Sequence, residues 1–313
     1  MTPLYRSRRD PTDIGMFNIN KPSGLTSHDV IARVRRLTGQ RRVGHAGTLD
    51  PMATGVLLVC LGKATRIVEY LTDRNKTYLA QIHLGVVTDT WDAEGQIISE
   101  HDTSMLTLDA IERALPHFMG HIIQTPPMYS AIKHQGRPLY ELARKGITIA
   151  RKPREIEITR LEIIEWHPPL ITLQAACSKG TYIRSLAYDL GEFLGTGGYL
   201  SGLTRLAVGR FLLKDAVDLE TLMEQGQDGS WRQHLLPLHL ALQHMPGITV
   251  DEDAVRRLCF GQEIELTSPP DACLCCAYDA QRHLVTVPKP DTDNRLWRPH
   301  KVLAPCEQPK AER

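Results

Sequence analysis

Short apolar runs alternate along this chain with segments whose apolar residues recur at helical spacing. This pattern predicts interleaved strands and helices. The clearest run, at residues 56–61, is continuously apolar and contains the β-branched residues Val56 and Val59, which is typical of an interior strand. Further strands are expected at residues 16–19, 78–87, 156–164 and 170–177, the last two paired with each other. The strand at residues 78–87 should run into an acidic turn at residues 88–95.

Helices are expected between these strands. The first runs from Ser27, the expected N-cap, to about Leu37, and Gly39 ends it. The others are expected at residues 64–71, 107–119, 138–146, 183–190 and 251–260. Because long helices do not separate the strands regularly, we expect an α/β fold with a mixed, largely antiparallel sheet and flanking helices.

The pattern of apolar residues changes near Gly247, after which a helix and then short strands are expected as far as Leu303. The 313 residues leave room for about two domains. We therefore expect a first domain at residues 1–246 and a second, β-rich domain at residues 247–313. Within the first domain, a stretch rich in proline, glycine and basic residues is interpreted as an insertion at about residues 124–154.

The composition indicates a soluble protein with a sizeable core, since 42% of its residues are apolar. No stretch reaches the roughly 18 apolar residues that a membrane helix needs, and no apolar segment follows the basic N-terminus. The seven cysteines are odd in number and unevenly spread, so no disulfide framework is expected. We expect a cytoplasmic monomer with reduced thiols and no membrane association.

Cys273, Cys275 and Cys276 lie close together and raise the possibility of a metal site. Zinc sites usually have four ligands at defined spacings, so His283 and Cys306 would have to contribute. The alternation of residues around these cysteines fits a strand with small apolar side chains equally well. We expect no metal.

Charge is segregated along the chain although the net charge is only +1. Residues 1–50 carry nine Lys or Arg against four acids, whereas residues 77–112 carry seven acids and no Lys or Arg. A second basic block comprises Lys133, Arg137, Arg144, Lys145, Arg151, Lys152 and Arg154. Such segregation can present a basic face to phosphates, and an ordinary solvated surface is the alternative.

Asp50 stands in a glycine-rich loop just ahead of the strand predicted at residues 56–61. Gly44, Gly47 and Gly55 permit positive φ angles and a close approach of the backbone to a ligand. Pro51 disfavours the helical conformation for Asp50. The loop is therefore a candidate site for a catalytic acid, although a turn aspartate before proline is about as common.

Two glycine-containing segments do not fit phosphate-binding loops. Gly62 and Lys63 would need a glycine at position 57 and a hydroxyl residue at position 64 to form a Walker loop. The segment at residues 195–197 lacks the third glycine of a dinucleotide fingerprint. Neither ATP nor a dinucleotide cofactor is expected.

The motif around Asp50, G-H-A-G-T-L-D-P-M-A-T-G-V-L, closely resembles the catalytic motif of TruB-type tRNA pseudouridine synthases. Four further blocks resemble motifs of this family, in the same order: N-K-P-S-G-L-T-S-H-D-V at residues 20–30, K-T-Y at 76–78, Q-T-P-P-M-Y-S-A-I-K at 124–133 and C-S-K-G-T-Y-I-R at 177–184. The resemblance covers roughly residues 14–210. The last part of the chain resembles, less strongly, the PUA domain, a small RNA-binding β-barrel.

The resemblance implies an enzyme that isomerises the uridine at position 55, in the T-arm loop of tRNA, to pseudouridine. The reaction gains and loses no atoms, so it needs no cofactor, but it needs a carboxylate and a closed pocket. By the same resemblance Asp50 is the nucleophile, Arg184 pairs with it, and Tyr78 stacks on the flipped base. A close guanidinium lowers a carboxylate pKa, so Arg184 should keep Asp50 ionised.

Further residues are assigned to RNA by this resemblance. The family's histidine that occupies the space left by the flipped nucleotide matches His45, and residues that line the uridine pocket match Tyr182 and Leu203. Lys21 is expected to have a structural or electrostatic role. In the insertion, which resembles the family's RNA-gripping element, phosphate contacts are expected from Lys133, Arg137, Arg151 and Lys152.

Two other functions would share some of these residues. An RNA-binding or tRNA-folding protein with a vestigial synthase pocket would need the basic surfaces without the chemistry. A carboxylate-dependent N-glycosidase would use Asp50 but would release free uracil. The residue types do not decide whether Asp50 attacks C1′, attacks C6 or removes a sugar proton.

Overall fold

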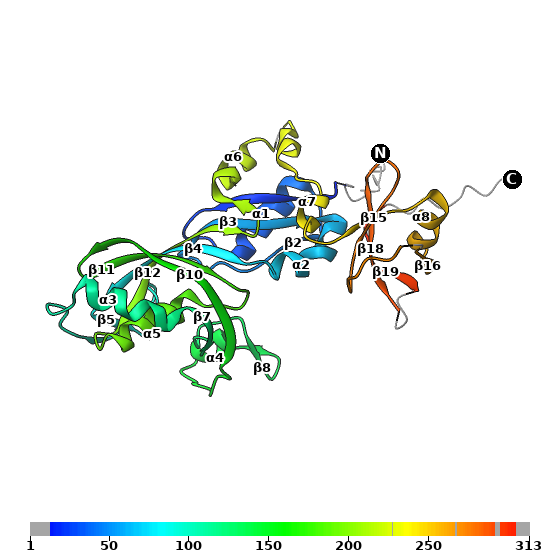
Figure 1. Cartoon of the computed structure of the whole chain (residues 1–313). Helices are drawn as coiled ribbons and strands as arrows, with labels where there is room; N and C mark the ends of the chain where they lie inside the picture. Colours follow the sequence, from blue (N-terminus) through cyan, green and yellow to red (C-terminus); the bar gives the residue numbers. More distant parts are fainter. Residues whose placement is uncertain (1–12, 227, 267, 292–294, 305–313) are drawn as a thin grey trace, which may run out of the picture.

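A large mixed sheet forms the main framework of the chain (Figure 1). The computed structural model describes residues 13–226, 228–266, 268–291 and 295–304. The strand order of the sheet is β14-β1-β3-β12-β4-β11-β10-β7, with β2 paired to β3 and β13 to β12. Among the described pairs, β1–β14 and β3–β12 are parallel and the rest are antiparallel, which confirms the expected sheet. The strands are β1 (Gly15–Lys21), β2 (Val43–His45), β3 (Thr54–Leu61), β4 (Lys76–Leu84), β7 (Gly120–Gln124), β10 (Arg154–His167), β11 (Leu170–Cys177), β12 (Gly198–Val208), β13 (Phe211–Leu212) and β14 (Val217–Asp218).

Strand β3 lies inside this sheet and is buried on both faces. Leu57 and Val59 pack in one core cluster with residues of α1 (Ser27–Thr38) and α6 (Leu219–Glu224). Leu58 and Cys60, which point to the opposite face, pack in a second cluster. A strand covered on both sides has no polar face, which explains its continuous apolar sequence.

The other half of the sheet carries α3 (Leu108–Ala114) and α5 (Ile183–Phe193). Leu186 and Leu190 of α5 belong to one cluster with Ile82 of β4 and Leu173 of β11. This cluster also includes buried Leu49, from the loop that carries the candidate acid. The loop therefore bridges the two halves of the sheet.

The predicted insertion leaves the sheet at the end of β7 and returns at β10, which pairs with β7. It contains a two-stranded hairpin of β8 (Lys133–His134) and β9 (Arg137–Pro138), followed by α4 (Leu139–Ala143). In Figure 1 this segment projects from one edge of the molecule. A second hairpin, β5 (Val86–Thr88) with β6 (Ile97–Glu100), encloses the acidic turn predicted from the sequence.

A separate five-stranded sheet, in the order β15-β17-β18-β19-β16, forms the C-terminal end of the described chain (Figure 1). It comprises β15 (Gly247–Thr249), β16 (Ile264–Glu265), β17 (Cys276–Tyr278), β18 (Leu284–Pro290) and β19 (Leu296–Val302), with α8 (Glu252–Cys259) beside it. Buried Trp297, Leu258 and Val250 centre its own core. Val287 and Leu303 instead share a cluster with Leu71 and Leu242 of the preceding part.

Several predicted boundaries differ from the structure. The N-cap of α1 is Thr26, not Ser27, because Thr26 forms a capping box with Asp29. The strand expected at residues 78–87 ends at Leu84, since Gly85 has a φ of 89° and turns the chain. The helix expected at residues 64–71 begins as a 3₁₀ turn.

The remaining helical segments are short: η1 (Gly62–Ile67), α2 (Val68–Thr72), η2 (Leu115–Phe118), η3 (Leu213–Asp215), η4 (Ser230–His234) and α7 (His239–Leu242). Among the helices of the described residues, none is both long enough and apolar enough to cross a membrane. Most stability in such short helices comes from packing rather than from helix propensity.

Gly55 is expected to be intolerant of any side chain. Its φ is 98°, and an added Cβ would lie 2.3 Å from the Arg205 carbonyl oxygen of the neighbouring strand. Gly24 also has a positive φ, 81°, but nothing lies within 4 Å of its Cβ position. We expect Gly24→Ala to cost about 1 kcal/mol and Gly55→Ala several times more, measured by thermal unfolding. Equal losses of Tm would show that β3 and β12 separate easily at this point.

Candidate active site

The loop that carries Asp50 joins β2 to β3, and buried donors satisfy its backbone carbonyls. Arg205, on β12, donates to the carbonyl oxygens of Gly47 (3.1 Å), Thr48 (3.3 Å) and Val56 (2.6 Å). Arg205 is 1% exposed, so these contacts are shielded from water. The arginine was not singled out from the sequence, yet it fixes the course of the loop.

Ser27 and Lys21 hold the next residues of the loop. The Ser27 hydroxyl accepts from the Leu49 amide at 2.9 Å and donates to the Leu49 carbonyl at 3.1 Å. Lys21 Nζ is buried and donates to the carbonyls of Leu25 (2.6 Å), Pro22 (2.9 Å) and Pro51 (3.2 Å). Ser27 therefore anchors the loop instead of capping the helix.

Burial lowers the Lys21 pKa to about 8, while the negative charge of Asp50 acts in the opposite direction. The three donors of its ammonium group are matched by three carbonyl oxygens. This geometry agrees with the structural or electrostatic role expected for Lys21, and its positive charge remains near the Asp50 carboxylate.

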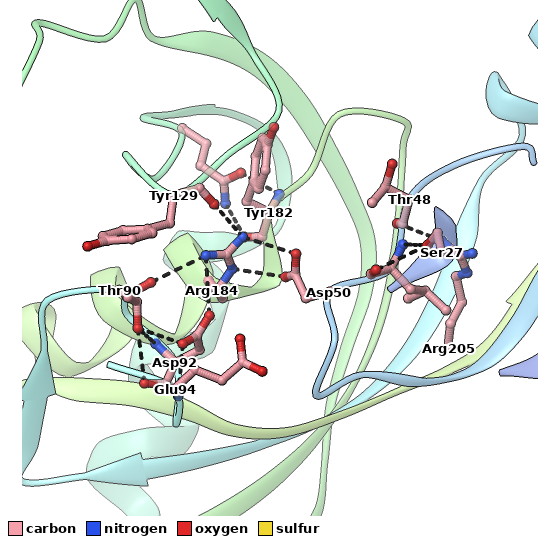
Figure 2. Close-up of polar contacts among 12 residues, drawn as sticks. Ser27, Thr48, Asp50, Thr90, Asp92, Glu94, Tyr129, Tyr182, Arg184 and Arg205 are labelled. Atoms are coloured by element: carbon pink, nitrogen blue, oxygen red, sulfur yellow. Dashed lines mark hydrogen bonds and ion pairs between the residues drawn. The ribbon is translucent and has the colours of Figure 1, made fainter. Parts of the chain in front are cut away.

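Asp50 and Arg184 form the predicted ion pair (Figure 2). Arg184 lies near the start of α5, and its Nε is 3.0 Å from Asp50 Oδ2 while its Nη2 donates to Oδ1 at 3.2 Å. The arginine side chain is 6% exposed, whereas that of Asp50 is 34% exposed. The guanidinium is thus buried behind a carboxylate that still faces solvent.

A second carboxylate shares the same guanidinium. Asp92 Oδ2 lies 3.3 Å from Arg184 Nη1, and the Asp92 side chain is 4% exposed. The carbonyl oxygens of Thr90 and Tyr129 accept from Arg184 at 3.4 Å and 2.8 Å. Figure 2 shows these groups converging on Arg184 from different segments. Besides Asp50, the arginine therefore has three further partners that fix its orientation.

The pKa of Asp50 is raised above its usual value because burial disfavours the charged form. Arg184 acts in the opposite direction, and the negative charge of Asp92 raises the pKa further. The sequence predicted that the arginine would keep this carboxylate ionised. Its effect has the predicted sign, but burial outweighs it and the charge of Asp92 adds to the upward shift.

Tyr78 lies on β4 opposite Arg205 of β12 and Ala175 of β11. It is 8% exposed and belongs to the core cluster that includes Leu49. Burial raises the pKa of its hydroxyl group, and the nearby charge of Arg205 opposes this shift. Tyr78 is therefore neutral at physiological pH and contacts the base of the Asp50 loop.

His45 ends β2 and packs edge-on against His28, with ring centroids 5.6 Å apart at 82°. Burial lowers its pKa to about 4, so its imidazole is neutral at physiological pH. Its buried Nδ1 has no hydrogen-bond partner among the described residues. The ring as a whole is half-buried, while this nitrogen is shielded from solvent.

Tyr182 and Leu203 lie near this site and are both half-buried. The side chain of Gln124, the last residue of β7, makes two hydrogen bonds to the Tyr182 backbone, at 2.8 and 3.0 Å. Arg154 stacks over the Tyr182 ring at 5.3 Å. Leu203 packs against the cluster that contains Tyr78.

The four basic residues selected in the insertion do not share one environment. Lys133, Arg137 and Lys152 are exposed and make no ion pair with any part of the chain that the structure describes. Arg151 is half-buried, donates to the Pro126 carbonyl at 3.2 Å and lies over the Trp91 ring. Arg151 is therefore held within the protein, unlike the other three.

Sequence reasoning missed Asp92 as well as Arg205. Asp92 belongs to the predicted acidic turn, where a buried carboxylate cannot be distinguished from a solvated one without knowledge of its partner. Only the long-range contact with Arg184 identifies it. The acidic turn was the sequence feature that could have drawn attention to Asp92.

The described residues contain no group of three or more His, Cys, Asp or Glu side chains that could hold a metal ion. Cys275 and Cys276 are buried beside or within β17, and Cys273 is exposed. Burial raises the pKa of the Cys275 thiol to about 12 and that of Cys276 to about 11. These values suit protonated, apolar side chains, and Cys306 lies outside the described residues.

Comparison with known proteins connects this geometry to a family. Residues 35–183 match the N-terminal domain of TruB family pseudouridylate synthases, and residues 184–243 match the C-terminal domain of tRNA pseudouridylate synthase B. The tRNA pseudouridine synthase B of Dehalococcoides mccartyi is 47% identical over 92% of this chain and 96% of its own length. That of Pasteurella multocida is 41% identical over 85% of this chain and 88% of its own.

A solved structure with the same fold is that of a Cbf5-Nop10-Gar1 complex, with a TM-score of 0.72 and 27% identity. The match covers 93% of this chain and 85% of the other. The fold, the ordered motifs and the extended identity to these relatives lead to one conclusion. The chain belongs to the TruB family of tRNA pseudouridine synthases.

Proposed function

We propose that this enzyme converts the uridine at position 55 of the tRNA T-arm loop to pseudouridine, and that Asp50 is the carboxylate that acts on it. The observation that supports this most directly is the Asp50–Arg184 pair. The guanidinium is buried while the carboxylate stays one-third exposed, so only the acid is open to a substrate.

The reaction breaks the bond from C1′ to N1 and forms one from C1′ to C5, so the detached uracil must stay enclosed while it turns. The target base must first leave the loop of the RNA, at a cost of roughly a few kcal/mol. Tyr78, Tyr182 and Leu203 are proposed to enclose the base. His45, whose ring is neutral, is proposed to occupy the space that the nucleotide leaves.

Binding of tRNA is proposed to use the insertion and the basic N-terminal part of the chain. The exposed residues Lys133, Arg137 and Lys152 supply charge for phosphates at the insertion. We also propose that residues 247–313 act as a second, PUA-like RNA-binding domain beside a catalytic domain at 1–246. The chain is proposed to work as a cytoplasmic monomer without metal or cofactor.

Incubation of the purified protein with unmodified tRNA, followed by nucleoside analysis, tests this function. Pseudouridine at position 55, with no loss of uracil, is the expected product. Free uracil would indicate an N-glycosidase, and tight binding without either product would indicate an RNA-binding or RNA-folding protein. Pseudouridine at a different position would contradict the proposed specificity alone.

Asp50→Asn is expected to reduce pseudouridine formation by at least about 100-fold, since the amide keeps the shape but not the nucleophilic charge. The affinity for tRNA should remain within a few-fold of wild type. Both quantities follow from single-turnover kinetics and a binding titration. Turnover above about a tenth of wild type, in protein free of deamidated contaminant, would remove Asp50 from this role.

Arg184→Lys and Asp92→Asn should move the acidic limb of the pH–rate profile in opposite directions. The ionised Asp50 is the active form, so the rate falls as pH drops below its pKa. Lysine cannot reproduce the two-point contact, so Arg184→Lys should raise that pKa and move the limb upward. Asp92→Asn removes a charge that raises it, so the limb should move downward.

Both variants should also lower the maximum rate, because Arg184 loses part of its orientation. The comparison is made on single-turnover rates over a series of pH values. An unchanged limb in both variants would show that Arg184 does not control the ionisation of Asp50.

Replacing Lys133, Arg137 and Lys152 together by Gln should weaken tRNA binding. Each lost phosphate contact should flatten the plot of log affinity against log salt by about 0.7 to 0.9. The rate at saturating tRNA should change much less. Arg113→Gln, which removes one exposed charge on α3, is a control that should leave the slope unchanged. A triple variant with a wild-type slope would show that other residues bind the phosphates, and the C-terminal domain would be the next candidate.

A further inference from the structure

Three side chains from separate segments stack beside the active site. The Trp91 and Tyr188 rings are nearly parallel, at an interplanar angle of 16°, with centroids 4.3 Å apart. The guanidinium carbon of Arg151 lies 5.4 Å from the Trp91 ring centroid. Trp91 belongs to the turn between β5 and β6, Tyr188 to α5, and Arg151 to the end of the insertion. We call these three side chains the aromatic latch.

Arg151 connects the end of the insertion to its start. Besides lying over Trp91, it donates from Nη1 to the carbonyl of Pro126, near the start of the insertion. Its Nε is buried and has no hydrogen-bond partner among the described residues. A guanidinium stacked on an aromatic face is stabilised by cation–π attraction, which increases as water is excluded. The charge of Arg151 is thus directed into the protein.

Trp91 lies between two residues that contact Arg184. The Thr90 carbonyl accepts from Arg184 Nη1, and the Asp92 carboxylate contacts the same nitrogen. The φ of Trp91 is 62°, in the left-handed region that bulky residues rarely adopt. Such a conformation persists only where surrounding contacts impose it. The stack on Tyr188 and the hydrogen bond from the Leu200 amide to the Trp91 carbonyl, at 3.1 Å, are contacts of this kind.

The start of the insertion reaches Arg184 independently. The Tyr129 carbonyl accepts from Arg184 Nη2 at 2.8 Å, and Ser185 Oγ donates to the Thr125 carbonyl at 2.8 Å. Both ends of the insertion are therefore attached to the groups that orient Arg184. A displacement of the insertion would be transmitted to the guanidinium through either end.

We propose that the aromatic latch couples the position of the insertion to the orientation of Arg184 against Asp50, and that Arg151 is a positioning residue, not a phosphate contact. This inference rests on the proposed roles of Asp50 and of the insertion. When bound RNA fixes the insertion, the aromatic latch fixes the position of the Thr90–Asp92 turn. This turn then fixes the orientation of the Arg184 guanidinium. The chemical step then depends on residues that touch neither substrate nor Asp50.

The test compares Arg151→Ala, Arg151→Lys, Trp91→Ala and Trp91→Phe with wild type. Single-turnover rates at saturating tRNA, their pH dependence and the salt dependence of tRNA affinity are measured. Arg151→Ala and Trp91→Ala should lower the saturated rate by about tenfold and move the acidic limb upward, with the salt slope unchanged. Trp91→Phe, which keeps a ring against Tyr188, and Arg151→Lys, which keeps the cation, should recover part of the rate.

Arg144 provides a matched control. It lies over the Tyr140 ring at 5.5 Å, within the same insertion, but it is exposed, and among the described residues its side chain has no contact with a group that orients Arg184. Arg144→Ala should leave the saturated rate and the acidic limb at wild-type values. A loss of rate equal to that of Arg151→Ala would mean that any disturbance of the insertion suffices, which would overturn the specific role of the latch.

Combining the variants shows whether they act through one device. If Arg151 and Trp91 act together, the double variant Trp91→Ala with Arg151→Ala should be no slower than the slower single variant by more than about twofold. Independent, multiplying losses would contradict coupling. If Trp91→Ala fails to fold, the cycle is run with Trp91→Phe.

The alternative role of Arg151 has a distinct signature. A salt slope flattened by about one, with a wild-type saturated rate, would make Arg151 a phosphate contact and overturn the proposal. Failure of the proposed function would instead appear in the wild-type protein, as absence of pseudouridine. A wild type that makes pseudouridine through Asp50, with latch variants of normal rate and pH profile, would reject only the latch.

Discussion

One buried guanidinium, that of Arg184, sets the constraint on which the rest of the site depends. It is shared by Asp50, which is partly open to solvent, and Asp92, which is not. A buried cation needs a matched negative charge, whereas two carboxylates exceed what it can neutralise. Burial is the largest cause of the raised pKa of Asp50, and the negative charge of Asp92 adds to it. Arg184 therefore compensates the burial of Asp50 only in part.

Much of this arrangement could be predicted where the signal is local or carried by a motif. The apolar run at residues 56–61 indicated a strand buried on both faces, and the structure confirms it. The Asp50–Arg184 pair followed from resemblance, since nothing in the spacing of two residues 134 positions apart predicts contact. The expected pairing of residues 156–164 with 170–177 is also confirmed.

What escaped prediction depends on partners distant in sequence. Thr26 and Ser27 are both plausible caps, and only the position of Leu49 assigns Ser27 to the loop. Arg205 looks like any strand arginine until the carbonyls of residues 47, 48 and 56 surround it. Arg151 belongs to a basic block that suggests phosphate binding, and the ring that it covers comes from a turn about 60 residues earlier.

The C-terminal sheet packs against the catalytic part through a shared hydrophobic core. Val287 and Leu303 pack with Leu71 and Leu242, and Lys63 and Arg66 donate to the carbonyls of Ala304 and Val302. Separating them would expose apolar side chains worth about 1.5–3 kcal/mol each. This packing therefore restrains the movement of the C-terminal sheet relative to the part that carries Asp50. An RNA that contacted both the C-terminal sheet and Asp50 would have to match the separation that this packing sets.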